Sequence, residues 1–455
     1  MKTIFITMSR GSLIRNFFHT GVISRLLEAG LRVVVLTPQW NEPELFKEYK
    51  HKDLYLEPLY MFSRARFRRF FIELYKGAVF NETVRIRYLY RVGGAKPSKL
   101  LYIPRMIFFA PLRFIPGSKW LIRFFDRVIN PQRAHDYLFE KYKPDLVFNT
   151  ASGGDGGVLK SAQRFGVRTV DMPKSWDNLS KVLFNTKADY LVVWGDFMKQ
   201  QAVKFQGYKP EEVVVTGIPQ FDFYSPRKAS NLLLSREEFC KKFNFDPKKK
   251  IILYGSAGAN LTDEPGYVEL ISEFVKEKKL GEVNILVRPH LGYKDDIKRF
   301  IKLEHLPNVA VDATDKQGDR FKDKWDTSWD HVINLFNSLR HADVCVNVAS
   351  TLILDATACG TPVINPNFDI DENADPYTWS VRRLYKDDYI KAVLGTGAVC
   401  FPGSKEEFLE TLKAILENGE RNKENEAKLI RAFLYRNDGK SASRIVEFLV
   451  SALAH

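Results

Sequence analysis

The segment around Ser350 and Thr351 carries residue types that suit an anionic ligand. The run from Val344 to Val348 predicts a strand, and a helix is expected from Leu352 to Cys359. Ser350 and Thr351 would then lie at a helix start, where two hydroxyls and unpaired backbone N–H groups could bind a diphosphate. Asp355, one turn into the helix, could reach a ribose hydroxyl. Simple N-capping by Ser350 is the alternative.

Arg288 and His290 follow a second expected strand, which runs from Val283 to Val287. Because ligands of parallel sheets bind outside the carboxyl ends of the strands, we expect both residues to face the crevice that holds Ser350 and Thr351. Arg288 offers a planar fork to phosphate oxygens. His290 could donate a hydrogen bond to a phosphate or sugar oxygen, or act as an acid or base. A single histidine after a strand could also be structural.

Strands and helices alternate along the chain in two successive series. Residues 3–8 and 31–37 predict strands around a helix over 12–29, and the pattern starts anew at Lys248. Two such series in 455 residues predict an α/β protein with two doubly wound, Rossmann-like domains. The expected parts are an N-terminal domain at 1–220, with an insertion at about 61–127, a C-terminal domain at 221–440, and a C-terminal helix at 441–455.

Several short motifs occur in the same order as in a known superfamily. They are Thr216-Gly217-Ile218-Pro219, Arg288-Pro289-His290, Ser350-Thr351-Leu352 with Asp355, Gly360-Thr361-Pro362 and Asp438-Gly439-Lys440-Ser441. In these motifs the chain resembles the GT-B glycosyltransferases, and within them the branch of CDP-glycerol glycerophosphotransferases and capsule glycosyltransferases. The resemblance is best over residues 170–450. It implies two Rossmann-like domains facing each other across a cleft.

The resemblance also implies roles for individual residues. The C-terminal domain would bind a nucleotide-activated donor, while the N-terminal domain would bind the acceptor. The helix over 441–454 would cross back to the N-terminal domain. Contacts to the donor nucleotide and its phosphates would come from Arg288, His290, Ser350, Thr351 and Asp355, and the cleft would be lined by Gly217, Gly255 and Ser256.

The type of reaction depends on one departure from the superfamily pattern. Retaining members often carry two glutamates separated by seven residues, but here Asp355 follows Asn347 at that spacing. This favours an inverting, single-displacement reaction, which needs a base for the acceptor hydroxyl. The candidates are Asp155 in a glycine-rich turn, His19 on the first helix, and Asp177 beside an aromatic residue. Loop capping by the aspartates and a core or surface role for His19 are the alternatives.

The segment 61–127 contains most of the net charge of +14. It has 15 lysines and arginines against three acidic residues, interleaved with phenylalanine, tryptophan and isoleucine. Cations beside bulky apolar groups suit an anionic lipid surface. We therefore expect a cytoplasmic protein, peripheral at the inner face of the cell membrane. Ordinary helices with solvated arginines are one alternative, and nucleic-acid binding, which no zinc-finger or RNP-type motif supports, is another.

Other motifs limit the class of enzyme. No G-x-G-x-x-G follows the first strand and no P-loop is present, which argues against a nicotinamide dehydrogenase and a P-loop enzyme. Asp369-Ile370-Asp371 resembles a glycosyltransferase metal motif but follows the last expected strand of the second domain, so we expect a loop, no metal and no cofactor.

These observations predict a glycosyltransferase-like enzyme. It would move a sugar or a glycerol-phosphate-like unit from a nucleotide-activated donor to a cell-surface polysaccharide or a lipid-linked acceptor. A nucleotide-sugar epimerase of the same fold and a non-catalytic nucleotide-binding protein at the membrane surface are the alternatives.

Overall fold

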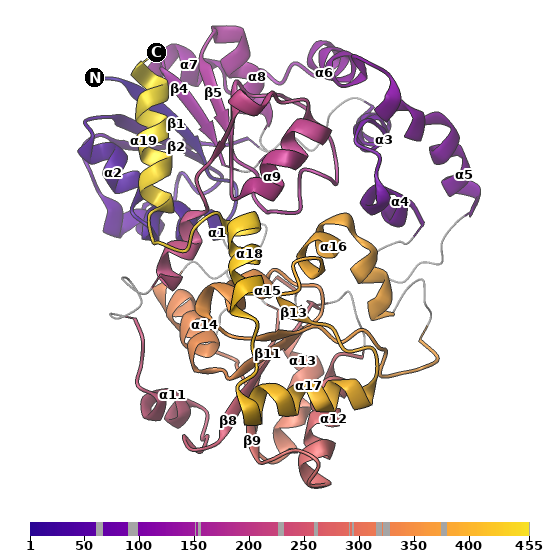
Figure 1. The fold of residues 1–455 in the computed structure, drawn as a ribbon. Coiled ribbons are helices and arrows are strands. Elements are labelled where there is room, and N and C mark those ends of the chain that lie inside the picture. The colour runs from indigo at the N-terminus through magenta and orange to yellow at the C-terminus, as the bar shows by residue number, and fades with distance from the viewer. Residues whose placement is uncertain are drawn as a thin grey trace.

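Two parallel β-sheets form the framework of the protein in the computed structural model (Figure 1). The first sheet has the strand order β3-β2-β1-β4-β5-β6-β7 and the second β10-β9-β8-β11-β12-β13, among the residues that the structure describes. These are residues 1–60, 67–89, 99–150, 152, 156–225, 232–258, 263–290, 292–293, 295–314, 321, 328–374 and 380–454. The predicted α/β class with two Rossmann-like sheets is confirmed. We call the sheet of β1 to β7 with its helices the first lobe, and the sheet of β8 to β13 with its helices the second lobe.

The strands are short, and the central ones are buried on both faces, as expected where helices cover a parallel sheet, whereas the edge strand β3 is partly exposed. In β2 the run of valine and leucine from 33 to 36 is fully buried. The strands of the first sheet are β1 (Thr3–Thr7), β2 (Arg32–Thr37), β3 (Leu54–Pro58), β4 (Leu146–Asn149), β5 (Arg168–Asp171), β6 (Tyr190–Val193) and β7 (Val213–Val215). Those of the second are β8 (Lys250–Gly255), β9 (Val283–Arg288), β10 (Val309–Val311), β11 (Val344–Asn347), β12 (Val363–Ile364) and β13 (Val399–Cys400).

The helical region that follows β1 differs from the single helix predicted over 12–29. It consists of α1 (Ser12–Ile14), a π-helical turn η1 (Arg15–His19) and α2 (Val22–Glu28). The break lies at Gly21, whose φ of +78° is accessible to glycine at little cost. The apolar residues of the region still pack into the core, and η1 places Arg15 and Asn16 at the cavity described below.

The C-terminal helix α19 (Ser441–Ala454) lies against the first lobe, beside α2 (Figure 1). Its first turn is capped by Asp222, whose two carboxylate oxygens accept the backbone N–H groups of Ser441 and Ala442 at 2.9 Å. Arg168 of β5 donates to the carbonyl of Ala452 at 2.6 Å at the other end. The chain therefore returns to its first sheet after it has built the second.

Four α-helices and the 3-10 helix η3 (Ala110–Phe114), all between β3 and β4, form a lateral arm, which we define as the described residues of 67–129. Phe71, Val84 and Ile122 contribute to a small apolar core that the arm shares with Leu183 of the first lobe. Thr83 and Asp388 exchange two hydrogen bonds, at 3.0 and 3.2 Å, which attach the arm to the second lobe. The α-helices are α3 (Arg68–Ala78), α4 (Glu82–Leu89), α5 (Lys99–Phe108) and α6 (Ser118–Ile129).

Part of the basic segment, residues 61–66 and 90–98, lies outside the described residues. In the part of the chain that is described, none of the helices has the length and apolar character needed to cross a bilayer.

Candidate functional site

A cavity of about 610 Å³ lies between the two lobes. The second lobe contributes Ser256, Arg288 and Ser350, which follow or end β8, β9 and β11, and the first lobe contributes Asn16 and Asp177. The predicted crevice at the carboxyl ends of the strands is therefore present, and Arg288 shares it with Ser350. This is the site that we consider for chemistry.

The turn between β11 and α15 (Leu352–Cys359) forms one wall of the cavity. Ala349 has a φ of +43°, an unfavourable conformation for a residue with a Cβ atom. The Ser350 hydroxyl accepts the N–H of Leu352 at 3.2 Å, and the Thr351 hydroxyl accepts the indole N–H of Trp176 at 3.2 Å. The backbone N–H groups of Ser350 and Thr351 have no hydrogen-bond partner among the described residues, and so remain available to an anion.

Two of the predicted donor contacts are engaged by the protein itself. The Asp355 carboxylate accepts a 2.6 Å hydrogen bond from the buried hydroxyl of Tyr224, and burial raises its pKa. The Arg288 guanidinium pairs with Asp312 and donates to the Ser338 hydroxyl at 3.1 Å. Both residues line the cavity, but the positive charge of Arg288 is compensated locally.

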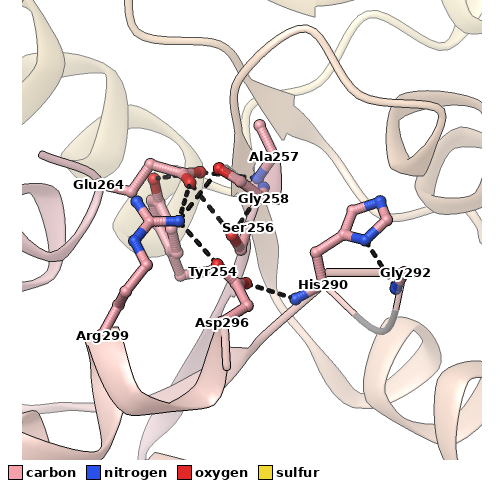
Figure 2. A network of polar contacts seen from close by, with 9 residues as sticks. All are labelled: Tyr254, Ser256, Ala257, Gly258, Glu264, His290, Gly292, Asp296 and Arg299. Atoms are coloured by element: carbon pink, nitrogen blue, oxygen red, sulfur yellow. Dashed lines mark hydrogen bonds and ion pairs between the residues drawn. The ribbon is translucent and has the colours of Figure 1, made fainter. Parts of the chain in front are cut away.

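One ring nitrogen of His290, Nδ1, is hydrogen-bonded within its own loop, and the other, Nε2, points away from that bond (Figure 2). Its Nδ1 accepts the N–H of Gly292 at 3.0 Å, which places the proton of the neutral ring on Nε2. Burial lowers the pKa of His290 and so favours this neutral form. His290 lines the cavity, where the Nε2–H group can donate to a phosphate or sugar oxygen.

The three residues predicted to line the cleft differ in their surroundings. Ser256 lines it, but its hydroxyl donates to Glu264 at 3.0 Å and accepts the N–H of Gly258 at 2.9 Å. At Gly255 a Cβ atom would lie 2.1 Å from the Leu352 side chain, so glycine allows α15 to approach β8. Gly217 does not line the cavity. It lies against the start of α19, with a φ of +80°.

The base candidates are separated by the structure. Asp177 lines the cavity, where it pairs with Lys181. His19 is not among the residues that line the cavity. Its Nδ1 lies 2.6 Å from the Tyr49 hydroxyl, and its ring centroid lies 4.5 Å from that of Trp329. Asp155 lies outside the described residues. Of the two described candidates, Asp177 is the one that lines the cavity.

Comparison with known proteins identifies the family. The sequence model described as CDP-Glycerol:Poly(glycerophosphate) glycerophosphotransferase matches residues 157–451, which is more than half of the chain. The protein belongs to this glycerophosphotransferase family. Membership makes it a transferase of the glycosyltransferase type, as the sequence predicted.

Individual relatives of this glycerophosphotransferase family member are distant. A UDP-N-acetylglucosamine–N-acetylmuramyl-(pentapeptide) pyrophosphoryl-undecaprenol N-acetylglucosamine transferase of Oenococcus oeni is 23% identical over 183 residues, or 38% of this chain. The match spans only 46% of the length of that curated relative.

Solved structures share the fold over the whole chain. The UDP-GlcNAc 2-epimerase of Neisseria meningitidis has a TM-score of 0.54 at 13% identity, covering 99% of this chain and all of that one. A glycosyltransferase of Rickettsia africae has a TM-score of 0.52 at 12% identity, covering 99% of this chain and 98% of that one. These similarities show the two-domain GT-B fold.

A group of cations, which the sequence did not indicate, completes the site of this glycerophosphotransferase family member. Burial and the neighbouring charges of Arg87 and Lys174 lower the pKa of Lys181 to about 7. Arg87 belongs to the arm, and the contacts of the arm with both lobes bring it to the cavity. Besides Arg288, the lysines and arginines that line the cavity are Arg15, Arg87, Lys174, Lys181 and Arg383.

Proposed function

We propose that this protein transfers a glycerol-phosphate unit from a CDP-glycerol-like donor to the hydroxyl end of a cell-surface polymer or lipid-linked acceptor. The observation that supports this most directly is the cavity itself, in which the anion-ready helix start of the second lobe faces Asp177 and several cations of the first lobe. The family match supports a glycerophosphate rather than a sugar as the transferred unit.

The donor diphosphate is assigned to the second-lobe wall. The N–H groups of Ser350 and Thr351 would bind phosphate oxygens, and the Nε2–H of His290 would donate to the same group. Arg15 and Lys181 would compensate the charge from the first lobe. Asp355 would stabilise the site through its hydrogen bond with Tyr224, or would accept a hydrogen bond from a ribose hydroxyl at Oδ2.

The reaction is a single displacement at phosphorus. The acceptor oxygen forms a bond to the phosphorus atom that carries glycerol, and the bond from that phosphorus to the bridging oxygen breaks, so that CMP leaves with the electron pair. Asp177 takes the proton of the acceptor hydroxyl. We propose that no metal ion is required. Asp369, in the Asp-x-Asp motif, instead accepts hydrogen bonds from the Ser380 hydroxyl and the Val381 N–H, both at 2.7 Å.

The arm is proposed to hold the enzyme on an anionic membrane, at the inner face where lipid-linked acceptors would lie. Phe108 and Trp120 are 71% and 66% exposed, and other large apolar side chains of α5 and α6 are exposed beside them. Arg113 and Arg127 lie next to aromatic rings of this surface. Exposed apolar groups with adjacent cations favour insertion at the headgroup level.

The decisive experiment measures products. Purified protein is incubated with CDP-glycerol and a lipid-linked glycerophosphate primer, with and without EDTA. Release of CMP with equal extension of the primer, undiminished by EDTA, supports the proposal. Loss of activity in EDTA that Mn²⁺ restores would contradict the metal-independent form, and conversion of a UDP-sugar without acceptor would favour an epimerase.

A further inference from the structure

A buried polar cluster anchors the loop that follows β8 (Figure 2). Glu264, immediately before α12 (Pro265–Lys276), is fully buried. Its Oε1 accepts the N–H of Ala257 at 2.7 Å and the Tyr254 hydroxyl at 3.3 Å, and its Oε2 accepts the Ser256 hydroxyl at 3.0 Å. One carboxylate therefore sets the conformation of a loop at the cavity wall.

Arg299 extends this cluster to the loop that follows β9. Its Nη1 donates to Glu264 Oε2 at 3.2 Å, to the carbonyl of Gly258 at 3.0 Å and to Asp296 Oδ1 at 2.7 Å. The other oxygen of Asp296 accepts the backbone N–H of His290 at 2.7 Å. A continuous series of charge-assisted contacts thus runs from Glu264 to the backbone of His290 (Figure 2).

The position of this backbone determines where the imidazole of His290 points. The ring is fixed at Nδ1 by the Gly292 N–H, and a Cβ atom at Gly292 would lie 3.0 Å from the ring carbon Cε1. Because hydrogen bonds hold both the backbone and Nδ1 of His290, the orientation of the ring, and with it that of the Nε2–H bond, is fixed. Glu264, Asp296 and Arg299 do not themselves line the cavity, so they act on a ligand only through the loops.

We propose that Glu264 is a positioning residue of the transfer reaction. It acts through Arg299 and Asp296 to hold His290 as an Nε2–H donor to a phosphate group of the bound donor. The identity of that ligand rests on the proposed function, whereas the fixed ring orientation and tautomer of His290 do not. The cluster also accounts for a fully buried glutamate beside a half-buried arginine: burial raises the pKa of Glu264 to about 7, and Arg299 opposes that shift.

The kinetic test compares two buried glutamates that each pair with an arginine. Glu264→Gln keeps the size of the side chain, but it replaces one acceptor oxygen by an NH2 group and removes the negative charge that the carboxylate places beside Arg299. Glu426→Gln does the same to the pair of Glu426 with Arg421, which does not line the cavity. We expect E264Q to lower kcat for CMP release by about 10- to 100-fold, because small misplacements at a reacting group have effects of this size, and E426Q to leave kcat unchanged. Equal kcat values for E264Q and the wild type would overturn the proposal.

A spectroscopic test decides the same question without activity. Protein labelled with ¹⁵N-histidine reports the tautomer of each ring, and the His290 signal is assigned by its loss in His290→Asn. We expect a neutral, Nε2-protonated His290 in the wild type and in E426Q, and a changed tautomer mixture or ring pKa in E264Q. Asp296→Asn, which leaves Glu264 in place, should show the same change if E264Q folds poorly. Wild-type His290 signals in both E264Q and D296N would overturn the positioning role, even if the donor proves not to be CDP-glycerol.

Discussion

The indole N–H of Trp176, in the first lobe, donates a 3.2 Å hydrogen bond to the hydroxyl of Thr351 at the start of α15 in the second lobe. The indole is buried against Tyr389 and Phe433, with ring centroids 5.2 and 5.5 Å away. This contact joins the acceptor side of the cavity to the wall assigned to the donor phosphates. A change in the distance between the two lobes would therefore also move the Ser350-Thr351 turn that is assigned to the donor phosphates.

Trp176→Phe should weaken this link while it keeps an aromatic ring in the same place. We expect a loss of about 1 kcal/mol in stability for the hydrogen bond and a several-fold higher KM for the donor. Thermal unfolding and steady-state kinetics measure the two effects. Thr351→Ser keeps the acceptor hydroxyl and should lose less than W176F in both measurements. Equal donor KM values for W176F and the wild type would show that the contact does not shape the site.

Asp177→Asn should remove the base. We expect kcat at saturating donor to fall by about 100-fold or more, because a general base contributes roughly 10² to 10⁴ to the rate. His19→Asn is the comparison, since His19 packs between Tyr49 and Trp329 outside the cavity and should affect stability more than kcat. A large loss of kcat in H19N together with an active D177N would exchange the two roles.

Lys181 should make donor binding depend on pH near neutrality. Burial and the nearby cations Arg87 and Lys174 lower its pKa to about 7 against the opposing effect of Asp387, and Asp177 pairs with the amine, which is charged below that pH and becomes neutral as the pH rises. We therefore expect the donor KM to increase between pH 6 and pH 8. Lys181→Arg stays charged throughout, so its KM profile should be flatter. A wild-type profile as flat as that of K181R would contradict a role for this charge.

The hydrogen bond between Tyr224 and Asp355 should contribute to stability. Tyr224→Phe leaves a buried carboxylate without this partner, at a cost of about 1 to 3 kcal/mol in the free energy of unfolding. Urea unfolding of the second lobe measures the loss. Tyr55→Phe, at an exposed tyrosine of β3, is the control and should change stability by about 0.5 kcal/mol or less. A similarly small effect of Y224F would mean that Asp355 has another partner or is solvated.

The sequence predicted those parts of the site that follow from local order along the chain. Ser350 and His290 come directly after strands, and parallel sheets bring strand ends together, so their meeting at one cavity could be foreseen. The pairing of Arg288 with Asp312 could not, because it depends on how β10 packs beside β9. The same holds for Arg87, whose place at the cavity depends on the docking of the arm. Gly217 was expected in the cleft, but its turn supports α19 instead.

The arm provides the last prediction, which separates membrane attachment from catalysis. Trp120 and Phe124 stack with ring centroids 5.4 Å apart on the exposed face of α6. Removing both as Trp120→Ser and Phe124→Ser should weaken binding to anionic vesicles at least tenfold, since burial of each large apolar side chain contributes roughly 1.5 kcal/mol or more. Trp40→Ser, at an exposed tryptophan outside the arm, is the control. Flotation with phosphatidylglycerol vesicles measures binding, which should also weaken as salt rises.

Transfer to a lipid-linked primer in vesicles should fall with binding, while transfer to a short soluble glycerophosphate primer should not. If the arm variant floats as well as the wild type, the apolar face of α6 does not meet the membrane; if both transfer rates fall together, the arm supports the cavity through Arg87 rather than through lipid.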